Sequence, residues 1–508
     1  MSKIPDETET IKSVDTPYDS LKATEQSSAS AGRTVTRTEA CSELNAGVQE
    51  SQNPQSAHDS SATGKKRDSV NPLKAVATEH ANYSSESIIT MRKQDVVARN
   101  DMLRLLHDRR PGFSLEQPFY TDPEFFKLDM ELIWYRDWLF IGHDCELPKP
   151  GSFITVQVGA YPVVLVRDQQ GNINAFHNSC RHRGSRICKT DKGTAAKLVC
   201  PYHQWTYELD GRMLFARNMA DGFDKSQFGL KPVACESVGG YIFICLAKEP
   251  ADFAPMRAMI EPYLLPHRLS DAKVAFESTV IEKGNWKLVW ENNKECYHCA
   301  ANHPELCRTL SEAPTSNSAY EPENDPELQA LWANWEAAGL PSKFRIDPAG
   351  QYRATRTPLL RDAVSFTMTG KRAVRQNLSD VSAERIGTLA LYHYPSTWNH
   401  VLGDHAVTFR VLPISATETA LTTKWLVHKD AVEGVDYDLD ELTHVWAQTN
   451  DQDRRIVEEN AFGILSPAYE PGPYSELYEG SVIQFNDWYA RFIGSRLAEG
   501  GQPLRGAV

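Results

Sequence analysis

The distribution of apolar side chains separates a polar N-terminal segment from the rest of the chain. Between Met1 and Thr90 there is no Phe or Trp, while Ser, Thr, Ala, Glu and Gln dominate. Such a segment cannot bury enough apolar surface to offset the entropy that ordering removes. We therefore predict that residues 1–94 form a disordered extension, and that order begins near Asp95.

The first ordered stretch has helical periodicity. From residue 122 to residue 138, apolar side chains recur every three or four positions, at Phe125, Leu128, Leu132 and Tyr135. This spacing places them on one face of an α-helix. We expect an amphipathic helix that leads into the domain that follows.

Short segments with strand character come next. Residues 153–166 are rich in β-branched and aromatic side chains, and a turn containing Gly171 leads to another strand that ends near His177. Further short strands flank the Asp210-Gly211 turn, and residues 240–246 close the series. Short strands joined by tight turns are typical of a small antiparallel β domain.

The length of the chain requires more than that one domain. At 508 residues it exceeds the size at which single cores stop growing, about 250–300 residues. We predict an α+β chain, with an antiparallel β domain over residues 95–250 after the helical lead-in. A larger domain over residues 251–508 should combine an antiparallel sheet with helices.

Charge and composition exclude several classes of partner. The formal net charge is -13, and charges of both signs are interspersed, so there is no basic stripe to follow nucleic acid phosphates. No apolar run approaches the ~20 residues of a membrane span, and the acidic start does not resemble a secretory signal. The ten irregularly spaced cysteines fit a reducing compartment better than a disulfide framework. We expect a cytoplasmic protein.

Two Cys/His pairs lie within the predicted β domain. Cys180 and His182 form C-x-H. After seventeen intervening residues, Cys200 and His203 form C-x-x-H. A structural zinc site, or four buried residues without a metal, are the alternatives. Zinc sites usually group like with like, as C-x₂-C and H-x₃-H, whereas each loop here carries one thiol and one imidazole. Mixed pairs are the ligand set of a Rieske [2Fe-2S] cluster.

A second group of histidines occurs in the predicted larger domain. His298 and His303 are five positions apart, which separates their side chains by roughly 140° on an ideal helix. They can meet at one site only if the helix ends or loosens between them. The spacing excludes the i,i+4 histidines of an H-E-x-x-H zinc protease, and a lone histidine pair is most often structural.

A carboxylate that the sequence places on the core-facing side of a helix, Asp453, completes a candidate iron site. Leu442, Trp446, Thr449, Asp453 and Ile456 fall on one stripe of a predicted helix, so Asp453 points where a core residue should. A carboxylate there is unfavourable unless it is paired or metal-bound. Together with two histidines it would form a facial triad with open positions for O₂ chemistry. The alternative is a solvated helix face with the carboxylate paired to a distant cation.

These motifs resemble one family along nearly the whole ordered chain. CRHRG at 180–184 and CPYHQW at 200–205 look like the cluster loops of Rieske non-haem iron oxygenases. ENNKECYHCAANHPEL, HYPSTWNHVLGDHAVTFR and YEPGPYS resemble the branch that acts on quaternary ammonium compounds, closest to glycine betaine monooxygenases. One position departs from the commonest pattern, because Gln204 stands where most members have Gly; we expect it to adjust the cluster site without abolishing it.

The resemblance implies a set of cofactors and roles. Cys180, His182, Cys200 and His203 would hold one [2Fe-2S] cluster, and His298, His303 and Asp453 one mononuclear Fe(II). Glu295 takes the place of a bridging carboxylate, usually Asp, that connects the iron site to the cluster of a neighbouring subunit in a homotrimer. Electrons would come from NAD(P)H through a separate flavin-containing reductase, since the chain has no G-x-G-x-x-G fingerprint after a strand.

The expected reaction is oxidative N-demethylation of glycine betaine to dimethylglycine and formaldehyde. Aromatic faces should recognise the quaternary ammonium, and Tyr394, Trp398 and His405 are the candidates, with packing in a sheet as the alternative. Another betaine, carnitine, choline or an aromatic ring are rival substrates. A Rieske electron carrier or a zinc-stabilised binding protein is the rival class. Cys296 and Cys299 could suggest zinc, but they are more simply interpreted as packing residues.

Overall fold

The computed structural model describes residues 85–310, 325–381 and 385–499. Helix α1 begins at Ser85, upstream of Asp95, and most of the predicted disordered extension lies outside the described residues. None of the helices in the described ranges is long and apolar enough to cross a membrane. The helices are α1 (Ser85–Asp108), α2 (Pro118–Thr121), α3 (Pro123–Asp129), the π-helix η2 (Met130–Trp134), α4 (Ala254–Leu264), α5 (Trp286–Asn293), α6 (Cys299–Asn302), α7 (Pro326–Ala337), α8 (Leu439–Ile464) and α9 (Gly480–Glu499), with 3-10 turns η3 (Asp144–Glu146), η4 (Lys225–Phe228), η5 (Leu265–His267), η6 (Leu269–Asp271) and η7 (Leu306–Arg308).

The lead-in helix forms where the sequence predicts it but changes its winding. Asp122 caps α3, because its Oδ1 accepts the Glu124 N–H at 2.7 Å. The chain then widens into the π-helix η2, which the apolar periodicity did not reveal. The N–H of Tyr135 donates to the carbonyl of Met130 at 2.9 Å, the i→i+5 spacing of a π-helix. The apolar residues of η2 are all buried.

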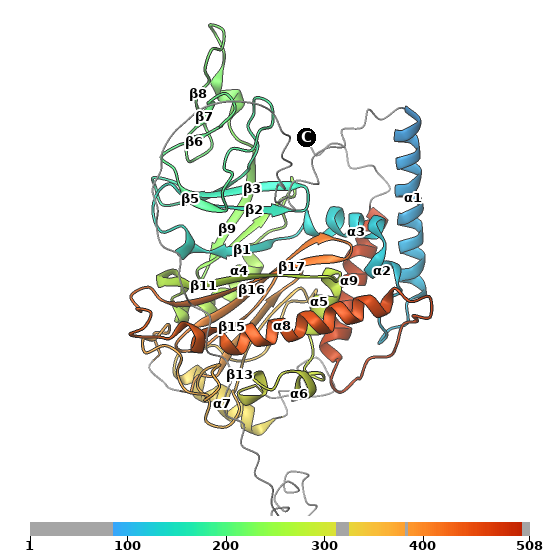
Figure 1. Ribbon diagram of the computed structural model, residues 1–508, viewed down its shortest axis with the longest axis vertical. Helices are drawn as coiled ribbons and strands as arrows, with labels where there is room; N and C mark the ends of the chain where they lie inside the picture. The colour runs from blue at the N-terminus through green and yellow to red at the C-terminus, as the bar shows by residue number, and fades with distance from the viewer. Residues whose placement is uncertain (1–84, 311–324, 382–384, 500–508) are drawn as a thin grey trace, which may run out of the picture. The chain divides into compact units, whose positions relative to one another are not determined.

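The predicted β domain is confirmed as two antiparallel sheets (Figure 1). A seven-stranded sheet has the order β1-β10-β9-β4-β3-β2-β5, and β6-β7-β8 form a small second sheet. The turns at Gly171 and Gly211 lie between strands as expected, both with left-handed backbone. The strands are β1 (Leu139–His143), β2 (Ser152–Val158), β3 (Tyr161–Arg167), β4 (Ile173–His177), β5 (Lys192–Thr194), β6 (Leu198–Val199), β7 (Thr206–Tyr207), β8 (Met213–Phe215), β9 (Pro232–Val238) and β10 (Tyr241–Cys245).

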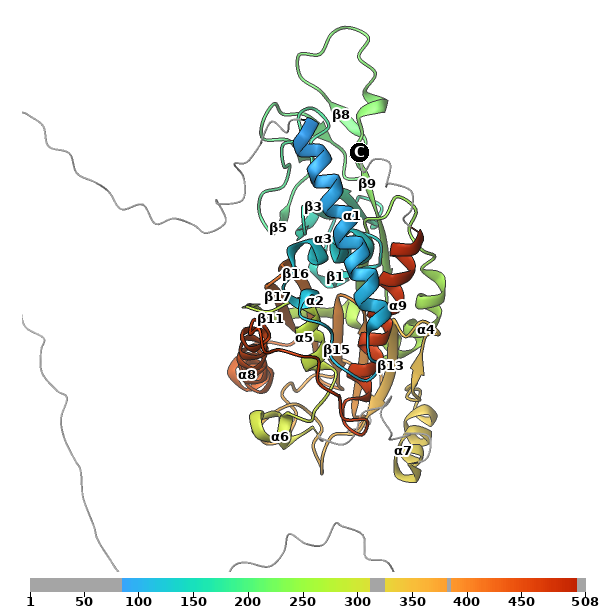
Figure 2. The same cartoon turned by 90° about the vertical axis from the view of Figure 1, so that its right-hand side faces the viewer.

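The remainder is an antiparallel sheet with helices, which confirms the predicted α+β class. Its order is β11-β17-β16-β15-β14-β13-β12. Helix α8 contacts β11 and lies across this sheet, and both views place α6 close to α8 (Figures 1 and 2). The strands are β11 (Ala272–Glu282), β12 (Arg345–Ile346), β13 (Tyr352–Thr357), β14 (Thr388–His393), β15 (Thr397–Val401), β16 (Ala406–Ser415) and β17 (Glu418–His428).

A buried ion pair joins three helices of the core. The Lys287 ammonium on α5 contacts the Asp129 carboxylate at the end of α3, and both side chains are completely buried. Trp286 Nε1 and the Tyr489 hydroxyl of α9 donate to the same carboxylate at 3.1 and 2.7 Å. The carboxylate therefore has several donors, which compensates for its removal from water. This junction fixes α5, the helix that leads to the predicted iron ligands.

Candidate metal centres and active site

The two loops that carry the predicted cluster ligands share one type of backbone hydrogen bond. In each loop, the N–H of the residue four positions after the cysteine donates to the cysteine carbonyl: Gly184 to Cys180 at 2.9 Å, and Gln204 to Cys200 at 3.0 Å. Both donors have left-handed backbone, with φ of 77° at Gly184 and 61° at Gln204. The usual glycine at position 204 thus has a physical reason, which is the backbone conformation that closes the loop.

The loops bring their four predicted ligands into a plausible cluster site. Cys180 and Cys200 are buried, and His182 Nδ1 lies 3.1 Å from His203 Nδ1 near the surface. The Tyr207 hydroxyl lies 3.3 Å from Cys180 Sγ. Two buried thiols paired with two outward imidazoles fit the donor set of a Rieske cluster, in which one iron takes sulfur and the other nitrogen.

The left-handed conformation of Gln204 gives a direct prediction. A non-glycine residue held there stores roughly 1–3 kcal/mol of strain, which exceeds the entropy that glycine adds to the unfolded chain. Gln204→Gly should therefore stabilise the cluster domain by about 1 kcal/mol, measured as a higher temperature for loss of the cluster's visible absorption. Gln157→Gly, in strand β2, is the control and should lower that temperature. A lower temperature for Gln204→Gly itself would contradict the interpretation.

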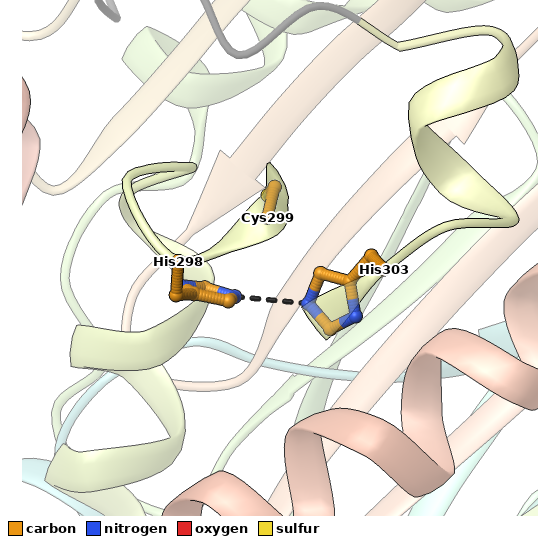
Figure 3. Close-up of side chains that lie close together, drawn as sticks. All are labelled: His298, Cys299 and His303. Atoms are coloured by element: carbon orange, nitrogen blue, oxygen red, sulfur yellow. Dashed lines mark hydrogen bonds between the residues drawn. The ribbon is translucent and has the colours of Figure 1, made fainter. Parts of the chain in front are cut away.

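The two histidines of the second group meet because the helix breaks between them. Helix α5 ends at Asn293, and His298 and His303 then cap the two ends of the four-residue helix α6. Their Nε2 atoms face each other at 3.0 Å (Figure 3). This is the loosening that the five-residue spacing required, and it brings both imidazoles to one point.

Asp453 approaches the same point from α8. Its Oδ1 lies 3.0 Å from His303 Nε2 and 3.3 Å from His298 Nε2. Three ligand atoms about 2.1 Å from one metal and at right angles to one another would lie about 3 Å apart. The Oδ1 atom is buried, and among the described residues nothing bonds to it with hydrogen-bond geometry. These observations fit an ion shared by the three side chains.

A thiol lies near this point as well. The ligand atoms of His298, Cys299 and His303 are all within 4.8 Å of one another, and Cys299 lies on α6 between the two imidazoles (Figure 3). Asp453 Oδ1 lies within 3.3 Å of both imidazole nitrogens. The neighbouring Cys296 thiol and burial raise the pKa of Cys299. Two imidazoles with a carboxylate are the ligand set of non-haem Fe(II) sites, which favours Asp453 over this thiol as the third ligand.

Carboxylates dominate the electrostatics of the triad. Burial by itself would lower the pKa of His298, but Asp453 and Glu295 raise that pKa to about 10. Glu295 Oε1 lies 2.5 Å from His298 Nδ1, and its Oε2 accepts the backbone N–H of His298 at 3.2 Å. Glu295 therefore fixes the ring so that Nε2 points toward Asp453, the orientation that a metal ligand needs.

Comparisons with known proteins agree with a [2Fe-2S] site and an iron site in this chain. Residues 137–226 match the model of the Rieske [2Fe-2S] domain, and residues 270–495 match that of the ring hydroxylating alpha subunit (catalytic domain). The chain is 48% identical, over 80% of its length, to the glycine betaine monooxygenase oxygenase subunit of Pseudomonas aeruginosa (strain UCBPP-PA14), and covers 95% of that protein. The chain belongs to the Rieske non-haem iron oxygenases.

Other members of this oxygenase family extend the picture. The glycine betaine monooxygenase oxygenase subunit of Chromohalobacter salexigens is 48% identical over 79% of the chain and 90% of its own length. The quaternary ammonium Rieske monooxygenase CntA has the same fold, with a TM-score of 0.59 at 21% identity over 75% of this chain and 96% of that one. The predicted family, the fold class and a cluster-plus-iron cofactor pair are confirmed, while the residue assignments rest on the geometry above.

Sequence reasoning missed the residue that orients the second histidine of the oxygenase. His303 Nδ1 lies 2.8 Å from Gln452 Oε1, and Gln452 Nε2 donates to Glu305 Oε2 at 2.8 Å. Gln452 directly precedes Asp453, so one turn of α8 supplies both a predicted ligand and the group that orients another. Adjacency to Asp453 was the only signal, and it did not show which way the amide points.

Removal of this amide should weaken metal binding. Contacts of this kind typically contribute 10- to 100-fold to metal affinity. Gln452→Leu should therefore raise the Kd for Fe(II), measured by titration of iron-depleted protein that retains its cluster. Gln448→Leu, one turn earlier on the exposed side of α8, is the matched control. Equal affinities of the two variants would mean that His303 needs no such support.

An aromatic cluster lies between α8 and the sheet, and Trp398 is part of it. Trp398 on β15 stacks on Phe409 of β16, with ring centroids 5.1 Å apart. Phe409 meets Trp446 of α8 at 5.1 Å, and Trp446 stacks on His400 at 4.8 Å. Trp446 precedes Asp453 by two helical turns, or about 10 Å. We refer to Phe366, Trp398, His400, Phe409 and Trp446 as the aromatic wall.

The other two pocket candidates lie in different surroundings. Tyr394 is fully buried against Trp290 and Trp488, and its hydroxyl donates to Gln484 Oε1 at 2.9 Å. Among the described residues, the ring of Tyr394 meets the rings of Trp290, Tyr392, Phe485 and Trp488, none of which belongs to the aromatic wall. Its role in substrate binding stays a prediction.

His405 lies in a buried polar cluster at the turn before β16. Its Nδ1 is 3.0 Å from Asp404 Oδ1, and Asp404 Oδ2 also accepts the Ser365 hydroxyl and the Ala373 N–H at 3.0 and 2.8 Å. The pair thus anchors the segment that carries Phe366. His405 Nε2 is buried without a hydrogen-bond partner among the described residues, and its contact with substrate stays a prediction.

Proposed function

We propose that this chain is the oxygenase component that N-demethylates glycine betaine to dimethylglycine and formaldehyde. The carrying observation is the 48% identity that extends over 95% of a glycine betaine monooxygenase oxygenase subunit. When bound, the cluster would supply electrons received from a separate NAD(P)H-dependent reductase, and the iron would supply O₂ activation. The protein contributes the ligands, their orientation and the substrate site.

The aromatic wall suits a quaternary ammonium group. Such a cation cannot donate a hydrogen bond, so ring faces are its main source of attraction, at about 0.5–2 kcal/mol each. Burial lowers the pKa of His400 to about 3. The imidazole in this wall is therefore uncharged at neutral pH and does not repel the cation.

Trp398 provides the test of this wall. Trp398→Ala should raise the KM for glycine betaine about tenfold, because one ring face of about 1–2 kcal/mol is removed, with iron and cluster contents unchanged. Trp398→Phe keeps an aromatic face and should recover most of the affinity. If both variants keep the wild-type KM, Trp398 does not contact substrate.

The substrate is tested by product formation. Purified protein with its iron and cluster, a reductase, NADH and glycine betaine should give one formaldehyde per O₂ consumed. Turnover of carnitine or proline betaine, with none of glycine betaine, would move the assignment to another member of the branch. Absence of formaldehyde with every N-methylated substrate would contradict demethylation.

We also propose that the oxygenase is a homotrimer in which Glu295 faces a neighbour's cluster. Two observations support contact surfaces at both centres. Tyr202 is 55% exposed beside the cluster ligand His203, and Tyr297 is 62% exposed beside His298. Tyrosine is enriched at protein–protein interfaces relative to the rest of the surface. Sedimentation of a fully active monomer would contradict this arrangement.

A further inference from the structure

A pocket of about 730 Å³ lies against the segment that follows the iron ligands. It is lined by Arg308 of η7 on one side and by residues 360–364 and 368–372 on the other. The Leu360 N–H connects the two sides by donating to the Thr309 carbonyl at 2.8 Å. Four lining side chains are cations, namely Arg308, Arg361, Lys371 and Arg372.

Among the described residues, few carboxylates lie near these cations. Asp362 is the acidic residue of the lining, and it pairs with Arg385 at 3.2 Å. Arg372 is held by the Val374 carbonyl at 3.1 Å and by the Asn377 side chain. In the part of the chain that the structure describes, no carboxylate lies within ion-pair distance of Arg308, Arg361 or Lys371. In a protein with a net charge of -13, such a concentration of cations attracts small anions.

The same segment forms part of the aromatic wall on its inner side. Phe366 is buried and meets His400 and Trp446, each with a centroid distance of 5.4 Å. Its neighbour Ser365 is anchored by Asp404. Residues 361–372 therefore present cations to the pocket and an aromatic ring to the protein interior, within a few positions of one another.

We infer that this pocket, called here the cationic antechamber, binds the carboxylate of a zwitterionic substrate before the substrate reaches the iron site. The inference rests on the proposed function and adds the basis of selectivity. Arg308, Arg361 and Lys371 attract the carboxylate and repel the trimethylammonium end, which turns that end toward the aromatic wall. A cation without a carboxylate, such as choline, is repelled by the antechamber and receives no compensating attraction.

Charge reversal tests the role in turnover. Arg361→Glu/Lys371→Glu should lower kcat/KM for glycine betaine at low ionic strength by about tenfold, the lower limit for electrostatic steering, and should remove its salt dependence. The loss should lie in KM rather than kcat. Lys343→Glu/Arg345→Glu makes the same charge change at exposed positions of the same domain and should behave as wild type. The milder Arg361→Gln/Lys371→Gln should show a smaller loss, with iron and cluster contents confirming folding.

Binding of small ions tests the anion site independently of whether glycine betaine is the substrate. In saturation-transfer NMR, acetate should bind the wild-type holoenzyme and the control but not the Arg361→Glu/Lys371→Glu variant, while tetramethylammonium binding should not decrease. Equal acetate binding by all proteins, or a change only in the KM for the reductase, would overturn the inference. If glycine betaine is not turned over but acetate binding still depends on Arg361 and Lys371, the proposed substrate fails and the anion site stands.

Discussion

Asp453→Ala should reduce turnover by more than about a hundredfold while the visible absorption of the [2Fe-2S] cluster stays intact. Asp453 Oδ1 lies 3.0 and 3.3 Å from the two histidine Nε2 atoms, so its removal deletes one of the three predicted ligands. Loss of an outer contact alone typically costs 10- to 100-fold in affinity or activity, and loss of a ligand should exceed that. The predicted ligands of the [2Fe-2S] cluster lie on loops of the β domain, where Cys180 and Cys200 belong to a separate apolar core, and should be unaffected.

The measurements are iron content, the cluster spectrum and formaldehyde formation. Asp451→Ala is a matched control, because Asp451 lies two residues earlier on α8 and pairs with Arg454 and Arg455 outside the site. This control should keep its iron and its activity. Asp453→Ala with wild-type turnover would remove the carboxylate from the ligand set and leave Cys299 as the remaining candidate.

The largest effect on stability is expected at the buried Asp129–Lys287 pair. Lys287→Met leaves the Asp129 charge buried without its counterion, and the loss of one partner from such a pair typically destabilises by about 3–5 kcal/mol. Burial lowers the pKa of Lys287, and the carboxylates of Asp129 and, more weakly, Glu291 oppose that shift. The free energy of unfolding is measured by denaturant titration of the holoenzyme.

Two comparisons identify the cause of that destabilisation. Lys283→Met removes an exposed lysine just before α5 and should have little effect. Asp129→Leu combined with Lys287→Met should be less destabilising than Lys287→Met alone, because no uncompensated charge then remains. If the double variant is the less stable one, the donors from Trp286 and Tyr489 rather than the ion pair determine the stability of this junction.

The sequence predicted the features that depend on local spacing. The cluster loops, the break between His298 and His303 and the core-facing position of Asp453 can each be inferred from a few neighbouring residues. The π-helix at Met130–Trp134 could not, because a single inserted residue hardly changes the apolar periodicity. The chain's family and its two-part α+β fold followed from motifs and length.

Contacts between segments that are far apart in the sequence could not be predicted from local spacing. The aromatic wall combines β15, β16, α8 and the segment around Phe366, and its composition depends on the register Trp398↔Phe409 across two strands. The Gln452–Glu305 link joins positions 147 residues apart. Of the wall, sequence reasoning proposed only Trp398 as a substrate contact and gave Tyr394 and His405 the same weight, because one strand does not show which neighbours lie beside it.

Helix α8 carries both Asp453, the predicted iron ligand, and, two turns earlier, Trp446 of the aromatic wall. Any replacement at Trp446 that tilts or shifts the helix also moves Asp453 relative to the two imidazoles. Strands β15 and β16 hold no predicted metal ligand. Trp398 and Phe409 can therefore change in size without moving Asp453 or the two imidazoles. Divergence toward bulkier or smaller N-methylated compounds should therefore accumulate in the strands, whereas the helix remains nearly invariant.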